Sequence, residues 1–370
     1  MKIAVLSSHT PSLFWFRIDM MTAFLHAGHD VVAIGNEPEE KWSKQFADEG
    51  IEYRQIYVER NGTNPVKDLK ALSSLRKVLA EEKPDKIFTY QAKTVIYGSI
   101  AAHQLGIKET YALIAGVGSV FLAAGHGIKN KLLQTVLCLE YCTSLRHCVK
   151  VLFQNKDDSD VFMEKKILPE EKIVYINGSG VNIKKFTPTP VPETPTFLFI
   201  GRLIRDKGIV EYLNACRIVK GRNEYIRCLL VGPYDTNPSA LKPEDLKKYI
   251  DDGSVEYFGE QADVRPYLNQ CSVYVLPSYH EGTPKTVLEA MASGRAIITT
   301  DAPGCRETVT EGMNGYLVPV KNANALAEKM LYLANNHELA ARMGNESRTV
   351  AEQKYNVNIV NNVIMNTMKL

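Results

Sequence analysis

The groups best placed to hold a polar ligand are two glutamates, Glu281 and Glu289, which are separated by seven residues. They follow a short apolar strand predicted at Val273–Leu276. At about 1.5 Å of rise per residue, a wholly helical segment would hold them roughly 12 Å apart. This exceeds the roughly 5–9.5 Å between the carboxyl groups of a glycosidase pair. We therefore expect the two carboxylates to hold different parts of one long ligand and not to share one proton transfer.

Between these glutamates, a helix is predicted to begin near Pro284, because proline in the first helical turn costs no intrahelical hydrogen bond. Glycine before it would let the backbone approach a ligand. The first amides of such a helix favour a phosphate through both their free donors and the helix dipole. The residues expected to bind the ligand here are Gly282, Thr283, Pro284, Lys285, Thr286 and Val287.

A second feature suited to phosphate is the sequence G-R-L-I-R-D-K-G, Gly201 to Gly208, which follows a predicted strand. Gly201 leaves room for a ligand, Arg202 can donate a forked pair of hydrogen bonds, and Lys207 adds a point charge. Arg205 stands off this pattern and is expected at the surface. A solvated basic turn is the alternative interpretation of the segment.

The composition excludes several classes of protein. The 370 residues are enough for two domains, and a net charge of +2 gives no electrostatic case for nucleic acid. Seven cysteines, without a C-x2-C pair or a histidine cluster, indicate reduced thiols and no metal site. The N-terminal sequence M-K-I-A-V-L-S-S is typical of a first strand and not of a signal peptide. No apolar run reaches about 18 residues, so a membrane-spanning helix is not expected.

Strands and helices alternate in both halves of the chain, which predicts α/β domains with parallel sheets. Strands are predicted at Lys2–Leu6, Asp30–Ile34, Ile51–Ile56, Lys86–Thr89, Thr110–Ile114, Lys150–Phe153, Thr196–Ile200, Arg227–Gly232, Glu256–Phe258, Val273–Leu276, Ala296–Thr299 and Asn314–Pro319. Ligands of such sheets bind beyond the carboxyl ends of the strands. In the first half these ends are Ser7–Ser12, Tyr90–Thr94 and Ala115–Ser119.

Two segments of the chain are predicted to lie outside this alternation of strands and helices. Ser7–Leu13 is predicted to be a loop that leads into a helix at Phe14–Leu25. Four prolines at positions 188, 190, 192 and 195 predict a linker between two domains.

The segment E-G-T-P-K-T-V-L-E-A-M-A-S-G resembles the E-x7-E signature of retaining, nucleotide-sugar-dependent glycosyltransferases of the GT4-like family. The resemblance implies the GT-B fold, with two facing Rossmann-like domains and a deep interdomain cleft. It implies that Glu289 holds the ribose hydroxyls and that Glu281 faces the donor sugar. Arg202 and Lys207 would grip the nucleotide diphosphate and stabilise the leaving group, which makes Arg202, Lys207 and Glu281 the catalytic residues. Further donor contacts are implied at Gly201, Gly232, Glu260 and Gln261.

The resemblance also implies three parts of the chain. Residues 1–182 would form an acceptor-binding domain and residues 183–355 a nucleotide-sugar-binding domain. Residues 356–370 would form a helix that crosses back to the first domain.

The acceptor side of the site is less defined by the sequence. His9 can be a site residue or a capped loop residue, and Gly180 a cleft residue or a turn glycine. Arg17, which stands among aromatic residues, could meet a lipid diphosphate or be a plain surface arginine. The candidate residues on this side are His9, Ser12, Arg17, Gly116, Gly118 and Gly180.

A membrane contact is expected from the segment Phe121 to Lys150, in which a glycine-framed loop ends at Lys129 and Lys131 before an apolar helix. The loop and its lysines could rest on an anionic membrane surface. A mobile loop that leads into a core helix is the alternative. With the family resemblance, this predicts a cytoplasmic enzyme attached peripherally to the inner face of the cell membrane.

The donor and acceptor are implied by a second resemblance. S-Y-x-E-G-x-P-x-x-V-L-E-A, with G-C-x-E and the N-terminal V-L-S-S, is similar to bacterial enzymes that assemble capsule, exopolysaccharide or glycoprotein glycans on undecaprenyl diphosphate. The nearest likeness is to N-acetylgalactosaminyltransferases of the N-glycan pathway, which use UDP-GalNAc. UDP-galactose, UDP-galacturonate and GDP-mannose remain open, as does a non-hydrolysing sugar-nucleotide epimerase. The predicted activity is of class EC 2.4, without a metal or other cofactor.

Overall fold

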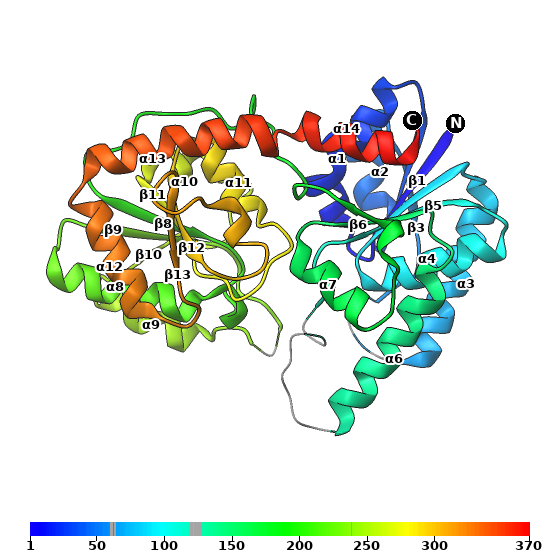
Figure 1. The fold of residues 1–370 in the computed structure, drawn as a ribbon, viewed down its shortest axis with the longest axis horizontal. Helices are drawn as coiled ribbons and strands as arrows, with labels where there is room; N and C mark the ends of the chain where they lie inside the picture. The colour runs from blue at the N-terminus through cyan, green and yellow to red at the C-terminus, as the bar shows by residue number, and fades with distance from the viewer. Residues whose placement is uncertain (60–61, 63, 119–120, 122–127, 238) are drawn as a thin grey trace. The chain divides into compact units, whose positions relative to one another are not determined.

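The computed structural model describes residues 1–59, 62, 64–118, 121, 128–237 and 239–370 (Figure 1). It divides the chain into two compact units. Unit 1 comprises Met1–Ser179 and Val360–Leu370, and unit 2 comprises Gly180–Ile359. Each unit contains one parallel sheet with helices, so the predicted α/β class with two Rossmann-like sheets is confirmed.

Unit 1 is built on seven parallel strands in the order β3-β2-β1-β4-β5-β6-β7. The order reverses between β1 and β4, and this reversal point is where open α/β sheets bind their ligands. Its elements are β1 (Lys2–Leu6), α1 (Thr10–His26), β2 (Asp30–Gly35), α2 (Glu39–Ala47), β3 (Glu52–Gln55), α3 (Pro65–Glu82), β4 (Lys86–Tyr90), α4 (Ala92–Gln104), β5 (Glu109–Ile114), α6 (Ile128–Leu145), β6 (Lys150–Phe153), α7 (Lys156–Glu164), η1 (Glu170–Lys172), β7 (Ile173–Tyr175) and, from Val360 on, α14 (Val357–Met368).

Unit 2 has six parallel strands in the order β10-β9-β8-β11-β12-β13, and its order reverses between β8 and β11. Its elements are β8 (Thr196–Ile200), η2 (Arg205–Lys207), α8 (Ile209–Arg222), β9 (Arg227–Val231), α9 (Pro243–Asp251), β10 (Glu256–Tyr257), α10 (Arg265–Gln270), β11 (Val273–Leu276), α11 (Lys285–Ala292), β12 (Ala296–Thr300), η3 (Arg306–Thr308), β13 (Gly315–Val318), α12 (Ala323–Ala334), α13 (His337–Val350) and η4 (Ala351–Tyr355).

The apolar sequence of β1 shows why the sheet of unit 1 is buried on both faces. Successive strand residues point to opposite faces. Ile3 and Val5 pack with side chains of α1, α2 and α14, whereas Ala4 and Leu6 pack with side chains of α3 and α4. Each strand therefore needs an unbroken apolar run, which is the pattern that made these strands predictable.

Helix α1 begins at Thr10, so the prediction of a loop through Leu13 was wrong by one helical turn. Two local features start the helix early. Pro11 lies in its first turn, and Thr10 donates to Asn36 Oδ1 from both its amide (2.9 Å) and its hydroxyl (3.2 Å). This start brings the N-terminus of α1 next to the carboxyl end of β1.

Helices α2 and α9 were not predicted, although both carry a start signal. Helix α2 follows Pro38 and has two acidic residues in its first turn. Helix α9 has Pro243 at its first position, again with two acidic residues in the first turn. Proline at the start and acidic residues beside the positive end of the helix dipole both favour a helix N-terminus.

The proline-rich stretch expected to link two domains lies within unit 2 and is bonded to it. The buried guanidinium of Arg295 donates to Leu268 O (2.9 Å) and Thr189 O (3.0 Å). Arg348 Nη1 donates to Phe186 O at 2.7 Å. The stretch is therefore held against the body of unit 2 by backbone carbonyl contacts, and the chain divides before it, after Ser179.

The C-terminal residues belong to unit 1. Val360, Ile364 and Met368, spaced four residues apart on α14, are buried in the core of this unit. Lys86, at the start of β4, donates from Nζ to Met368 O. Asn361 Nδ2 donates to Asp19 O at 3.1 Å. Apolar burial and these polar contacts together fix the end of the chain on unit 1.

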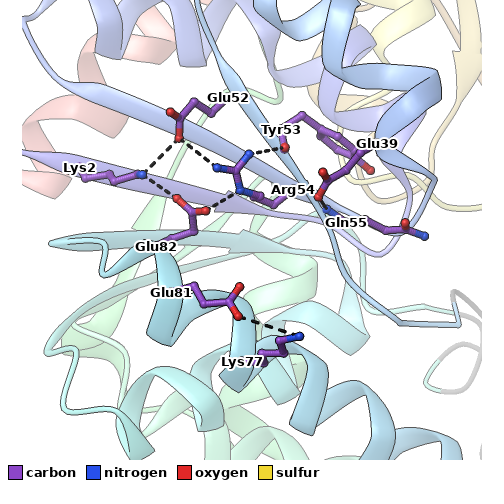
Figure 2. A network of polar contacts seen from close by, with 9 residues as sticks. All are labelled: Lys2, Glu39, Glu52, Tyr53, Arg54, Gln55, Lys77, Glu81 and Glu82. Atoms are coloured by element: carbon purple, nitrogen blue, oxygen red, sulfur yellow. Dashed lines mark hydrogen bonds and ion pairs between the residues drawn. The ribbon is translucent and has the colours of Figure 1, made fainter.

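A network of ion pairs ties α3 to the sheet of unit 1 at the end of β1 opposite to its carboxyl end (Figure 2). The side chain of Glu82, which is 8% exposed, accepts from Lys2 Nζ (2.6 Å) and from Arg54 Nε (2.6 Å). Glu52 Oε2 lies 3.2 Å from the same Lys2 nitrogen. Burial raises the pKa of Glu82, but the hydrogen bonds from Lys2 and Arg54 outweigh it and the pKa lies below its usual value.

Replacing Glu82 tests this network. Because the folded-state pKa is depressed, the carboxylate stabilises the protein above its unfolded pKa and the effect is lost as the pH falls through the folded value. Glu82→Gln should lower the free energy of unfolding in urea by about 1–3 kcal/mol at pH 7.5, and by less at acid pH. Glu81→Gln is the control, since Glu81 is exposed and lies 4.0 Å from Lys77. An equal loss in both variants would contradict a specific role for Glu82.

Candidate functional site

The candidate site lies at the reversal point of unit 2, where the loops after β8 and β11 are bonded together. The amide of Tyr279 donates to Asp206 O at 2.9 Å, and Ser278 Oγ donates to the same carbonyl at 3.1 Å. Gly208, with φ +71°, lies so close to Pro277 that a Cβ there would be 2.0 Å from its carbonyl oxygen. The predicted cationic turn and the E-x7-E loop therefore form one surface.

Glycines permit two further close contacts at this edge. A Cβ on Gly232 (φ +146°) would lie 1.9 Å from Gly201 O. A Cβ on Gly304 (φ +77°) would lie 2.2 Å from Glu281 O and 2.4 Å from Gly282 O. Real Cβ atoms do not approach backbone oxygens so closely, so only glycine allows these loops to meet. The loop after β12, of which Gly304 is a part, thus supports the backbone of Glu281.

The predicted catalytic side chains already have partners in this structure. Lys207 Nζ forms an ion pair with Glu281 Oε1. Arg202 Nη1 lies 2.8 Å from Asp235 Oδ2, a contact that sequence reasoning missed. Both positive charges are thus held at the edge by carboxylates, and a bound diphosphate would compete with these carboxylates for them. In the described part of the chain, no three His, Cys, Asp or Glu side chains gather closely enough to hold a metal ion.

Helix α11 begins as predicted, with Pro284 as its N-cap and Lys285 as its first residue. One detail differs from the prediction. The amide of Val287, expected to be available to a ligand, donates to Pro284 O at 3.0 Å. The helix closes its first turn early, so the amide of Val287 is already bonded within the protein.

Tyr274, on β11, was not predicted but positions this helix start. Its buried hydroxyl lies 2.7 Å from Thr286 Oγ1 and 3.1 Å from Ile200 O. It therefore connects the first turn of α11 to the end of β8, one residue before Gly201. A tyrosine in an apolar strand gives no sequence signal for this role, because the order of the strands in the sheet determines which residues its hydroxyl contacts.

Glu289 lies on the second turn of α11. Burial raises its pKa to about 7, although Lys285 and Lys185 act in the opposite direction. A carboxyl group with this pKa titrates near neutral pH and can bind hydroxyl groups in either protonation state. Lys185 was not predicted; it comes close only because the segment after Gly180 packs onto unit 2.

The residues expected near the nucleotide base lie after β10. Gln261 Nε2 donates to Phe258 O at 2.7 Å, which holds the loop in a turn. Gly232 donates its amide to Gly259 O at 2.8 Å, so this loop is bonded to the end of β9. Glu260 is exposed. The three loops after β8, β9 and β10 thus lie in sequence along the sheet edge.

The predicted acceptor-side residues are divided between the two units. Ser12 Oγ donates to His9 O (2.7 Å), and His9 is the N-cap of α1. Gly116 and Gly118 follow β5 with φ of +137° and +79°. Gly180 belongs to unit 2. A Cβ on Gly180 would lie only 2.6 Å from Val357 Cα, so this turn has room only for glycine.

The expected membrane segment is described only in part. Residues 119–120 and 122–127, and the side chain of Lys129, lie outside the described residues. On α6, Leu132, Val136 and Leu139 are exposed at helical spacing, and Lys131 is exposed beside them. Within the described ranges, no helix combines the length and the apolar character needed to cross a membrane.

The chain matches two family models. Residues 2–154 match the model described as glycosyl transferase 4-like, and residues 194–336 match the model described as glycosyl transferases group 1. The first covers most of unit 1, and the second contains every loop of the candidate site in unit 2.

Curated relatives and solved structures extend over the whole chain. An N,N'-diacetylbacillosaminyl-diphospho-undecaprenol alpha-1,3-N-acetylgalactosaminyltransferase of Campylobacter jejuni is 30% identical over 97% of this chain and 96% of its own length. A UDP-Gal:alpha-D-GlcNAc-diphosphoundecaprenol alpha-1,3-galactosyltransferase of Escherichia coli is 24% identical over 74% of this chain and 72% of its own. HepE of Anabaena, solved with UDP and glucose, has a TM-score of 0.77 at 17% identity and covers 100% of this chain and 99% of its own.

The glycine contact beneath Glu281 can be tested with a matched pair. Gly304→Ala should lower the free energy of unfolding by about 2–5 kcal/mol, because left-handed strain and backbone overlap add, and it should weaken UDP binding. Gly312→Ala has nearly the same φ, +76°, but nothing lies within 4 Å of its Cβ. It should cost only about 1–2 kcal/mol and leave UDP binding unchanged in calorimetry. Similar behaviour of the two variants would contradict the supporting role of Gly304.

The raised pKa of Glu289 predicts opposite effects of rising pH on the stability of the protein and on its affinity for UDP. Because the folded-state pKa lies above the unfolded value, the unliganded protein should lose stability as the pH rises toward about 7. If Glu289 holds ribose hydroxyls, as the family resemblance implies, UDP affinity should rise over the same range, since the carboxylate is the stronger acceptor. Calorimetry with UDP and thermal unfolding between pH 5.5 and 8.5, values spanning about 1.5 units on either side of this pKa, would measure both. Glu289→Gln should reduce both dependences, leaving those of the terminal phosphate of UDP and of other titrating groups, and the exposed Glu338→Gln should change neither; dependences in Glu289→Gln equal to those of the wild type would contradict the assignment.

Proposed function

This chain belongs to the group 1 glycosyl transferases, and we propose that it transfers an N-acetylhexosamine, first of all N-acetylgalactosamine, from its UDP derivative to a saccharide on a polyprenyl diphosphate. It is a glycosyltransferase of class EC 2.4 with the GT-B fold, and it acts in bacterial glycan assembly. The relatives from Campylobacter jejuni and Escherichia coli, named for diphospho-undecaprenol acceptors, support this choice of acceptor.

One observation carries the proposal: the cationic turn and the E-x7-E loop are bonded together at the reversal point of unit 2. A diphosphate, which has two adjacent anionic groups, suits a site with Arg202, Lys207 and the start of α11. We propose that unit 2, which contains the nucleotide-sugar-binding domain expected at residues 183–355, binds the nucleotide sugar. Unit 1 would then bind the acceptor.

In the proposed reaction, the bond from the anomeric carbon to the donor phosphate breaks as a bond to the acceptor oxygen forms. The acceptor proton passes to the departing phosphate oxygen on the same face, so the anomeric configuration is retained. Arg202 and Lys207 exchange their carboxylate partners for the phosphate oxygens and stabilise the developing charge. Glu281, released from Lys207, faces the donor sugar. These cations supply the charge that a divalent metal would otherwise provide, so we propose that none is required.

We further propose that the enzyme is cytoplasmic and attached peripherally to the inner face of the cell membrane through unit 1. The exposed apolar stripe of Leu132, Val136 and Leu139 on α6 supports this contact. Lys131 beside it would favour anionic lipid headgroups. A lipid-linked acceptor would then reach the enzyme along the surface in which its lipid is anchored.

The function is tested with purified protein, a panel of UDP- and GDP-sugars, and an undecaprenyl-diphosphate-linked saccharide. We expect UDP release from UDP-GalNAc or another UDP-N-acetylhexosamine only when the lipid-linked saccharide is present, and to the same extent with EDTA. UDP-galactose, UDP-galacturonate and GDP-mannose are the alternative donors. Conversion of the donor sugar without an acceptor would instead identify a sugar-nucleotide epimerase. Absence of transfer from every donor would contradict the proposed function.

The phosphate grip is tested in the same assay by Lys207→Ala. Loss of this charge should lower kcat roughly hundred- to thousandfold, because the charge acts mainly in the transition state. Arg205→Ala removes an exposed positive charge from the same short turn and should retain turnover. Turnover of Lys207→Ala equal to that of Arg205→Ala would count against Lys207 as a phosphate ligand.

A further inference from the structure

Arg17 is a buried cation without an anionic partner. Its side chain is on α1, and the residue is 3% exposed. Among the described residues, Nε has no hydrogen-bond partner and no carboxylate forms an ion pair with the guanidinium. The guanidinium lies over the ring of Tyr90, whose centroid is 4.9 Å from Cζ. The sequence had left open whether this residue is a plain surface arginine, and its burial excludes that alternative.

Burial of a charge without a partner costs several kcal/mol, which folded proteins avoid unless the group has a use. Burial lowers the pKa of Arg17, and Tyr90, which is uncharged at neutral pH, is the group that acts in the opposite direction. An arginine stays protonated in proteins even so. The unliganded protein therefore holds a positive charge whose natural complement, an anion, is not supplied by the described residues.

The residues beside Tyr90, which Arg17 contacts, are joined by a hydrogen-bond network. Gln91 accepts hydrogen bonds at Oε1 from Ser7 Oγ (2.9 Å) and Ser8 Oγ (2.8 Å). The backbone of Gln91 has φ +70° and ψ 141°, a conformation that residues other than glycine rarely adopt. Ser12 Oγ lies 2.8 Å from the Tyr90 hydroxyl and 3.1 Å from Gln91 Nε2. Backbone strain held in place by a hydrogen-bond network is a common feature of binding sites.

This cluster lies at the reversal point of the unit 1 sheet. Ser7 follows β1, and Tyr90 ends β4, the two strands between which the order reverses. Long side chains on a helix lean toward its N-terminus, so Arg17 leans toward this edge, in agreement with its contact to Tyr90. Unit 1 thus repeats the plan of unit 2, with a cation and a helix start at the crevice where such sheets bind ligands.

The two residues before Arg17 are apolar and open to solvent. Trp15 is 56% exposed and Phe16 45% exposed. These rings give α1 an exposed apolar surface in the turn that carries Arg17. A prenyl chain that ends in a diphosphate combines an apolar part with an anion, whereas UDP carries no such chain.

We propose that Arg17 binds a phosphoryl oxygen of the diphosphate in the lipid-linked acceptor, with Tyr90 and Gln91 holding the guanidinium and the adjoining loop in place. This inference deepens the proposed function, on which it rests. The donor diphosphate is the other source of the same chemistry, but unit 2 has its own cations for that group, Arg202 and Lys207.

The first experiment separates acceptor from donor. Arg17→Met keeps the apolar length of the side chain and removes its charge. It should raise KM for the undecaprenyl-diphosphate-linked saccharide roughly ten- to hundredfold, the range for a hydrogen bond to a charged group, and leave KM for the UDP-sugar unchanged. Arg17→Lys should recover part of the loss. Arg76→Met removes an exposed arginine of α3 and should change neither constant. An unchanged acceptor KM in Arg17→Met, or a raised donor KM, would overturn the proposal.

The second experiment does not depend on transfer, so it decides the inference even if the proposed function fails. Farnesyl diphosphate in detergent should raise the thermal midpoint of the wild type but not of Arg17→Met, whereas UDP should raise both. Without ligand, Arg17→Met should unfold at the same temperature as the wild type or higher, since a buried unpaired charge has been removed. A lower midpoint would identify a structural role. Equal protection by inorganic pyrophosphate and farnesyl diphosphate would overturn the assignment to a lipid carrier.

Discussion

The candidate donor site depends on close backbone contact between loops that are far apart in the sequence. Gly208 meets Pro277, and Gly304 meets Glu281 and Gly282, at distances that leave no room for a side chain. These contacts bring a cationic turn, a carboxylate and a helix N-terminus to one edge of the sheet. Since hydrogen bonds and charges act over a few ångströms, this placement determines what the residues can bind.

Both units use their sheets in the same way. In each, the strand order reverses once, between β1 and β4 or between β8 and β11, and the polar groups of interest follow these strands. In unit 1, stabilising ion pairs such as Lys2–Glu82 lie at the opposite end of β1. In unit 1 these ion pairs and the proposed acceptor site thus lie at different ends of the strands. The strained backbone of Gln91 and the buried charge of Arg17, which contacts Tyr90 at the end of β4, thus lie away from these ion pairs.

Much of this could be predicted from the sequence, because apolar runs define buried strands and because Pro284 and Gly201 act through local geometry. The α/β class and the position of α11 followed from such patterns. The partners of the charged groups did not, since Asp235 and Tyr274 meet Arg202 and Thr286 only through the strand order. The burial of Arg17 depends in the same way on β4 lying beside β1.

The claim on which the rest depends is that the cationic turn and the start of α11 form one diphosphate site. A crystal structure with UDP bound tests it most directly. We expect the diphosphate between Arg202, Lys207 and the first residues of α11, with the ion pair between Lys207 and Glu281 opened. A diphosphate bound elsewhere, with that ion pair intact, would contradict the claim.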